Sequence, residues 1–118
     1  MEREIINKLS KSLNEIRNVK NISTFVIVKR ADSSLWDIVI GGVSLDTQEN
    51  LVQIANILKK FLTPNDLKEF SRIVLLNSTD SFISNLRKTF SLEQGDMELQ
   101  NTQINNILIN HAYLLYSK

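Results

Sequence analysis

Two runs rich in β-branched and aromatic residues, 24–28 and 35–40, are separated by only a short polar segment. Such runs favour strands, because branched and aromatic side chains pack well on a pleated surface. The polar break around residues 31–34 is short enough to join the two strands as a hairpin. We therefore expect a β-sheet with an antiparallel strand pair in the first third of the chain, closed by Gly41 and Gly42.

Segments with helical periodicity surround this hairpin. The N-terminal segment is expected to form an amphipathic helix that ends near residues 18–21, and a second helix should run from a cap at Asp46 or Thr47 to about Phe61. Their apolar faces are expected to hold Ile5, Ile6, Leu9, Leu13 and Ile16 in the first, and Leu51, Ile54, Ala55, Leu58 and Leu62 in the second.

The middle of the chain predicts two more helices around a third strand. Thr63 and Pro64 provide a cap and a first-turn proline for a short helix that continues through Phe70. Residues 72–77 are almost continuously apolar, which is typical of a strand covered on both faces, and we expect this strand to lie in the centre of the sheet. A cap at residues 78–80 then begins another amphipathic helix.

The C-terminal part predicts a second strand pair. Residues 93–96 form a turn, and residues 97–103 and 107–116 favour strands with a bend at Asn105 and Asn106. The expected fold is therefore an α+β single domain over residues 1–118, with a mixed β-sheet and helices packed on it. Its predicted order of elements is α-β-β-α-(α)-β-α-β-β.

The composition narrows the possible functions. The chain has no cysteine, which excludes disulfides, thiolate zinc sites and a cysteine nucleophile. Residues 1–10 mix charged and apolar side chains and lack the apolar core of a signal peptide. No apolar run approaches the roughly twenty residues that span a bilayer. We expect a soluble cytoplasmic protein that makes no contact with membranes.

Charge is balanced overall but unevenly distributed. Lysine and arginine total 14 against 13 acids, which is far from the excess of a dedicated nucleic-acid-binding protein. Residues 1–30 have a net charge of +4 and residues 31–58 a net charge of −4. The paired cations Lys29–Arg30, Lys59–Lys60 and Arg87–Lys88 leave a nucleic-acid-binding accessory protein as one alternative.

Few residues suggest catalysis. His111 is the single histidine, so it is the one candidate for acid–base chemistry near neutral pH. Asp37, Asp46 and Glu49 lie in the segment without cations and suggest a second alternative, a small metal-dependent phosphodiesterase or nuclease. The glycine pair at 41–42 lacks the surroundings of either nucleotide-binding pattern. We expect no cofactor and no resident metal, and a protein that is not an enzyme.

The leading hypothesis from the sequence is a non-catalytic interaction or regulatory module that associates with a protein partner or with itself, as in a homodimer. The candidate surface is the apolar C-terminal strand with Tyr113, Leu114 and Tyr116, which is expected to lie at a sheet edge where a partner strand can pair. Lys29 and Arg30 are further candidates for partner contacts.

Overall fold

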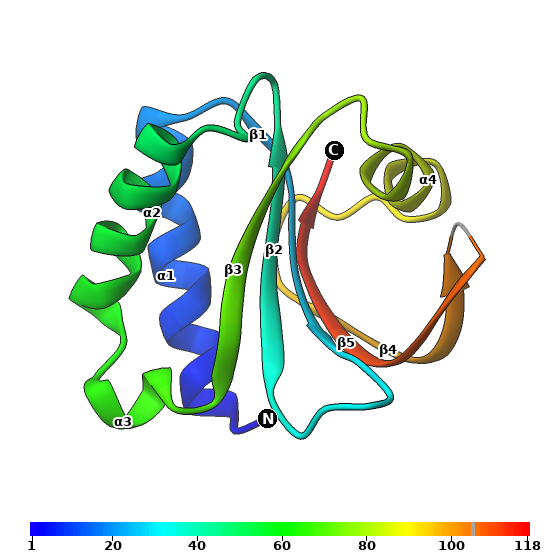
Figure 1. Ribbon diagram of the computed structural model, residues 1–118, viewed down its shortest axis with the longest axis horizontal. Coiled ribbons are helices and arrows are strands. Elements are labelled where there is room, and N and C mark those ends of the chain that lie inside the picture. Colours follow the sequence, from blue (N-terminus) through cyan, green and yellow to red (C-terminus); the bar gives the residue numbers. More distant parts are fainter. Residues whose placement is uncertain (105) are drawn as a thin grey trace.

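The computed structural model describes residues 1–104 and 106–118, and in this part of the chain it contains four helices and a five-stranded sheet (Figure 1). The predicted α+β class and the predicted order of elements are confirmed. The elements are α1 (Arg3–Val19), β1 (Ile22–Lys29), β2 (Trp36–Gly42), α2 (Gln48–Phe61), α3 (Pro64–Leu67), β3 (Phe70–Asn77), α4 (Ser81–Thr89), β4 (Met97–Ile104) and β5 (Ile107–Ser117).

The sheet is mixed, with the strand order β3-β2-β1-β5-β4. β1 pairs antiparallel with both β2 and β5, and β4 pairs antiparallel with β5. β2 and β3 are parallel, because the chain returns through α2 and α3 before it enters β3.

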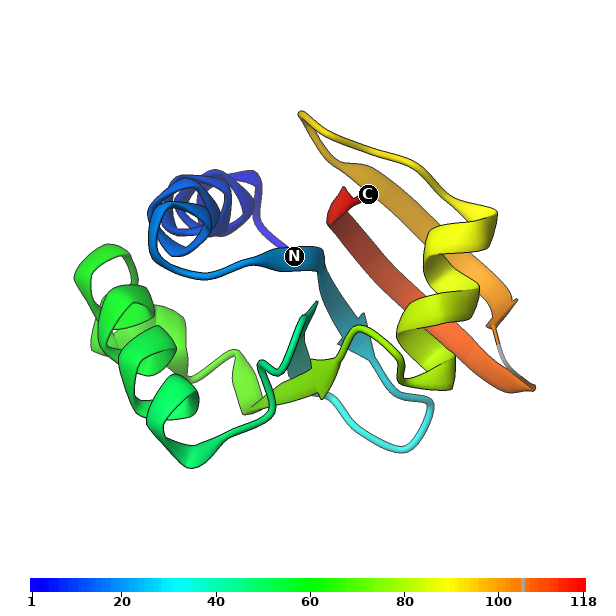
Figure 2. The same ribbon diagram turned by 90° about the horizontal axis from the view of Figure 1, so that it is seen from above.

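Two hydrophobic clusters lie on opposite faces of the sheet. In β1, Phe25 and Ile27 belong to the cluster under α1 and α2, whereas Val26 and Val28 belong to the cluster with α4. This division follows from the alternation of side chains along a strand. Figure 2 shows the resulting layers, with α1 and α2 on one side and α4 with the β4–β5 hairpin on the other.

The helices begin at the expected capping residues. Thr47 caps α2, Thr63 and Asp66 form a reciprocal capping box on α3, and the Asp80 carboxylate accepts a hydrogen bond from the Phe82 amide at the start of α4. The predicted inner face of α1 is buried throughout. None of the helices in the described part of the chain is long and apolar enough to cross a bilayer.

Three expectations about the strands are wrong. β3 lies at an edge of the sheet and not in its centre, which β1 occupies. β5 lies between β1 and β4, so the C-terminal strand is not an edge. The short helix ends at Leu67, and Phe70 begins β3 instead of ending α3. The strand positions escape the sequence because an edge strand partly covered on both faces carries the same apolar residues as a central one.

The β4–β5 hairpin curls towards α4 (Figure 1). Leu99 and Ile104 both belong to the α4 cluster, although a spacing of five residues would place them on opposite faces of a regular strand. Asn101 lies between them with a φ of 48°, a left-handed conformation that reverses the alternation. At the predicted bend, Asn105 lies outside the described residues and Asn106 has a φ of 62°.

Candidate functional site

The outer side of β3 is unpaired within the described residues. On its inner side, the Ser78 amide donates a hydrogen bond of 2.9 Å to the Gly42 carbonyl of β2. Backbone groups alternate in direction along a parallel strand, so from Arg72 onwards, where the register with β2 is regular, those of Ile73 and Leu75 point away from β2. β3 therefore presents a row of free donors and acceptors to a further strand.

Apolar side chains accompany this free backbone on both faces. Ile73 and Leu75 pack at the margin of the α1/α2 cluster, and Val74 and Leu76 pack at the margin of the α4 cluster. All four side chains are only partly buried. A partner strand along β3 would cover the apolar surface that remains exposed.

The two ends of β3 differ in charge. Lys68, Glu69 and Arg72 lie at its start and give a net charge of +1, whereas Asp46 and Asp80 flank its end. Asp46 shares a shallow groove with Ile73 and Leu75 on the α2 side. An antiparallel copy of the same strand would bring the basic start of one chain to the acidic end of the other.

A second groove, with a volume of about 360 Å³, lies beside β3 on the α4 face. Residues of β1, β2 and β3 form its floor, and residues at the start of α4 and at the start of β5 form its sides. The volume and the apolar lining fit the usual range of small-molecule sites. The apolar lining residues include Val28, Val39, Val74, Leu76, Phe82 and Ile109.

Asp37 is the buried polar residue of this groove. Its side chain is only 5% exposed, and its Oδ2 lies 3.2 Å from the Arg30 Nε and 3.3 Å from the Arg72 Nε. Its Oδ1 is buried and has no hydrogen-bond partner in the described part of the chain. Arg72 faces Asp37 because the two residues are register partners in the parallel ladder. Sequence reasoning named Arg30 only as a candidate for partner contacts and missed Arg72, which only the correct pairing of β2 with β3 would have revealed.

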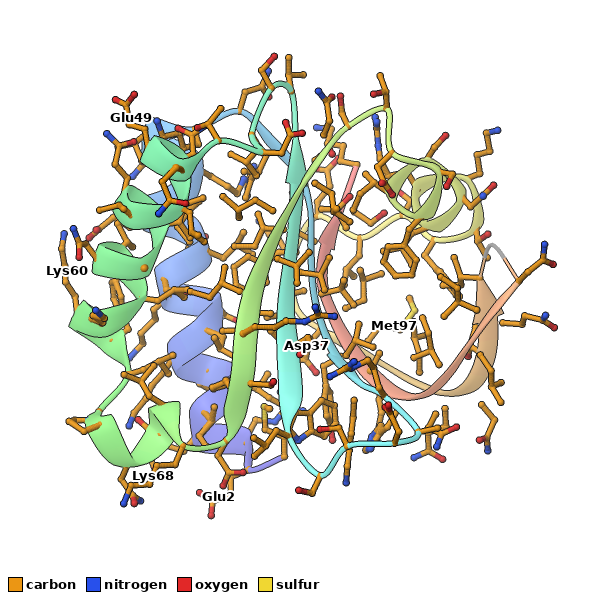
Figure 3. All side chains as sticks on the ribbon, viewed as in Figure 1. Glu2, Asp37, Glu49, Lys60, Lys68 and Met97 are labelled. Atoms are coloured by element: carbon orange, nitrogen blue, oxygen red, sulfur yellow. The ribbon has the colours of Figure 1, made fainter. Side chains whose placement is uncertain are left out.

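The structure does not assemble the three acids proposed for a metal site. Asp37 lies near the start of β2 on the α4 face, whereas Asp46 lies in the connection after β2 and Glu49 in the first turn of α2. Figure 3 shows Asp37 and Glu49 well apart. Within residues 1–104 and 106–118, no group of three potential metal-binding side chains comes together. The three acids therefore form no shared metal site within these residues, and the metal-dependent phosphodiesterase stays an untested alternative.

His111 lies in a cluster of side chains from three strands. Its Nε2 is 2.6 Å from the Glu98 Oε2, and its ring centroid lies 5.0 Å from that of Trp36 and 5.1 Å from that of Tyr113. Hydrogen bonds from Gln100 and then from His111 lower the pKa of Glu98. Burial raises the pKa of the Tyr113 hydroxyl. His111 therefore contacts a carboxylate and two aromatic rings, and these contacts link side chains of β2, β4 and β5.

The residues expected at an exposed C-terminal edge are buried. Tyr113, Leu114 and Tyr116 are 8%, 0% and 5% exposed, because they pack in the hydrophobic clusters on the two faces of the sheet, and both edges of β5 are paired. They cannot form the partner surface that the sequence suggested. The Arg17 guanidinium lies over the ring of Tyr116, 4.3 Å from its centroid.

The paired cations do not share one surface. Lys29 lies over the Trp36 ring and Arg30 contacts Asp37. Lys59 and Lys60 lie on α2 and Arg87 and Lys88 on α4, and these two helices cover opposite faces of the sheet (Figure 2). This distribution gives no continuous basic track for a nucleic-acid backbone.

Comparison with protein-family models, with curated proteins and with solved structures finds no match to this chain. The function is therefore inferred from the edge of β3 and from the groove beside it.

Proposed function

We propose that this domain is a non-catalytic interaction module that associates with a second copy of itself through the outer edge of β3. The two β3 strands pair antiparallel about a two-fold axis and join the two sheets. The observation that carries this proposal is the free backbone of an eight-residue edge strand flanked by partly exposed apolar side chains. The lack of cysteine is compatible with a cytoplasmic role.

The contrast between the two sheet edges supports the proposal. β4, at the opposite edge, carries the exposed polar residues Glu98, Gln100 and Gln103, and Asn101 kinks it. Polar side chains and irregular backbone are devices that protect an edge from pairing. The middle of β3, from Ile73 to Leu76, has neither a charge nor a positive φ.

The charges favour a second copy over an unrelated strand. A two-fold interface places each surface patch against the same patch of its partner, so the patch has to complement itself. Antiparallel pairing brings Lys68 and Arg72 of one chain towards Asp46 and Asp80 of the other. Parallel pairing would bring like charges together at both ends.

The substitution Ile73→Pro tests the edge directly. Ile73 is half-buried and its amide points outwards, so proline removes an outer donor without breaking the ladder to β2. We expect self-association to weaken at least about tenfold, because each dimer loses two backbone hydrogen bonds. Sedimentation equilibrium over a range of protein concentrations measures the dissociation constant.

Ile73→Ala is the matched control, since it also removes the isoleucine side chain but keeps the amide. It should associate more tightly than the proline variant, and far-ultraviolet circular dichroism should show both variants folded. A wild-type protein that stays monomeric at every concentration contradicts the proposal. Equal dissociation constants for the proline and alanine variants would assign association to another surface.

A further inference from the structure

We propose that the groove on the α4 face binds a small organic anion, an aliphatic carboxylate whose head group contacts Arg30 and Arg72. Its chain lies along the apolar floor towards Phe82. This inference does not rest on self-association, because the residues that line the groove come from a single chain.

The two guanidinium groups are held in place from one side. Each turns its Nε towards the Asp37 Oδ2, and neither guanidinium has a second ion-pair partner within the described residues. The two side chains are 45% and 55% exposed, so part of each guanidinium is accessible. A guanidinium group presents paired N–H donors whose spacing matches the two oxygens of a carboxylate.

If its role were only structural, Asp37 would lower the stability of the fold. A buried carboxylate loses its hydration, and partly exposed arginines return little of that free energy. The unpartnered Oδ1 adds a further cost. An apolar residue at this position would suit the surrounding valines, so we infer that Asp37 serves to position the two arginines.

The rest of the groove sets the orientation of the ligand. Arg72 lies near the start of β3, whereas Asp80 and Phe82 lie beyond its end. The Asp80 carboxylate caps α4 through the Phe82 amide and would repel an anionic head group. The head group therefore belongs at the arginine end and the apolar chain at the Phe82 end.

Sodium octanoate is a suitable probe, used below its critical micelle concentration. Isothermal titration calorimetry should show saturable binding of one octanoate per chain, with a dissociation constant of about 1 mM or lower. Octylammonium has the same chain with the opposite charge and should not bind. Neutral 1-octanol should bind at least about tenfold more weakly than octanoate.

Arg30→Gln should weaken octanoate binding at least about tenfold and leave the oligomeric state unchanged. Arg87→Gln is the matched control, because Arg87 is exposed on α4 and does not line the groove. Tryptophan fluorescence checks that both variants fold. Three results would each overturn the inference: no octanoate binding to the wild type, equal binding to both variants, or octanol binding as tightly as octanoate.

Discussion

Gly41 and Gly42 allow two close approaches at the end of β2. A methyl group on Gly41 would lie 2.7 Å from the Ile83 Cδ1 of α4, and one on Gly42 would collide with the Asn21 backbone carbonyl. The first neighbour is the end of a side chain that can rotate. The second is backbone between α1 and β1 and has little freedom to move.

The two glycines should therefore differ in their tolerance of alanine. We expect Gly41→Ala to lower the free energy of unfolding by about 1 kcal/mol and Gly42→Ala by about 3 kcal/mol. Urea unfolding followed by circular dichroism measures both values. Equal losses would mean that the connection between α1 and β1 adjusts as easily as the Ile83 side chain.

The partners of Asp37 could not be predicted from the sequence. The sequence groups it with Asp46 and Glu49 as a metal-site candidate because all three lie in the segment without cations. Its actual partners come from the far end of β1 and from β3. The pairing of strands that are distant in the sequence decides which cations contact a buried acid. A local sequence pattern does not contain that pairing.

Among the elements, the β4–β5 hairpin depends on one unusual backbone conformation. Asn101 holds a positive φ, which lets Leu99 and Ile104 reach the same apolar cluster. Asparagine tolerates this conformation better than most residues, and a β-branched residue tolerates it poorly.

Replacing Asn101 with valine should lower the free energy of unfolding by about 1–2 kcal/mol, because valine is strained at this φ. Asn101→Gly serves as the control and should change stability by less than about 0.5 kcal/mol, since glycine adopts the conformation freely. Chemical denaturation measures both. If valine and glycine prove equivalent, the hairpin does not need the left-handed residue.

Element types could be predicted from local signals, but strand neighbours could not. Capping chemistry at Thr63 and Asp66 predicts α3, and the spacing of apolar residues predicts α1. The predicted positions of β3 and β5 in the sheet are wrong, because an apolar run indicates how much of a strand is buried and does not indicate which strand lies beside it. The candidate site was missed for the same reason, since it exists only where β3 ends the sheet.

At the scale of the whole molecule, one sheet supports two apolar clusters. β1 contributes alternate residues to both, so neither cluster can lose its packing without disturbing the strand that the other needs. We therefore expect the domain to unfold in a single cooperative step.

Leu86→Ala tests this coupling. Leu86 is fully buried in the α4 cluster, whereas the single tryptophan, Trp36, lies in the cluster on the other face. The substitution should lower the free energy of unfolding by about 2–5 kcal/mol. Tryptophan fluorescence and circular dichroism should report the same shifted midpoint. A tryptophan transition that keeps the wild-type midpoint would show that the two faces unfold independently.

The position of β1 between β2 and β5 also has a consequence for synthesis on the ribosome. β2 follows β1 within a few residues, but β5 follows only after α2, α3, β3, α4 and β4 have been made. Until then a growing chain holds β1 with one side unpaired, and its valines and isoleucines are open to non-native contacts. Completion of the sheet must wait for β5 to emerge, so the native structure of this domain forms only after all five strands have left the ribosome.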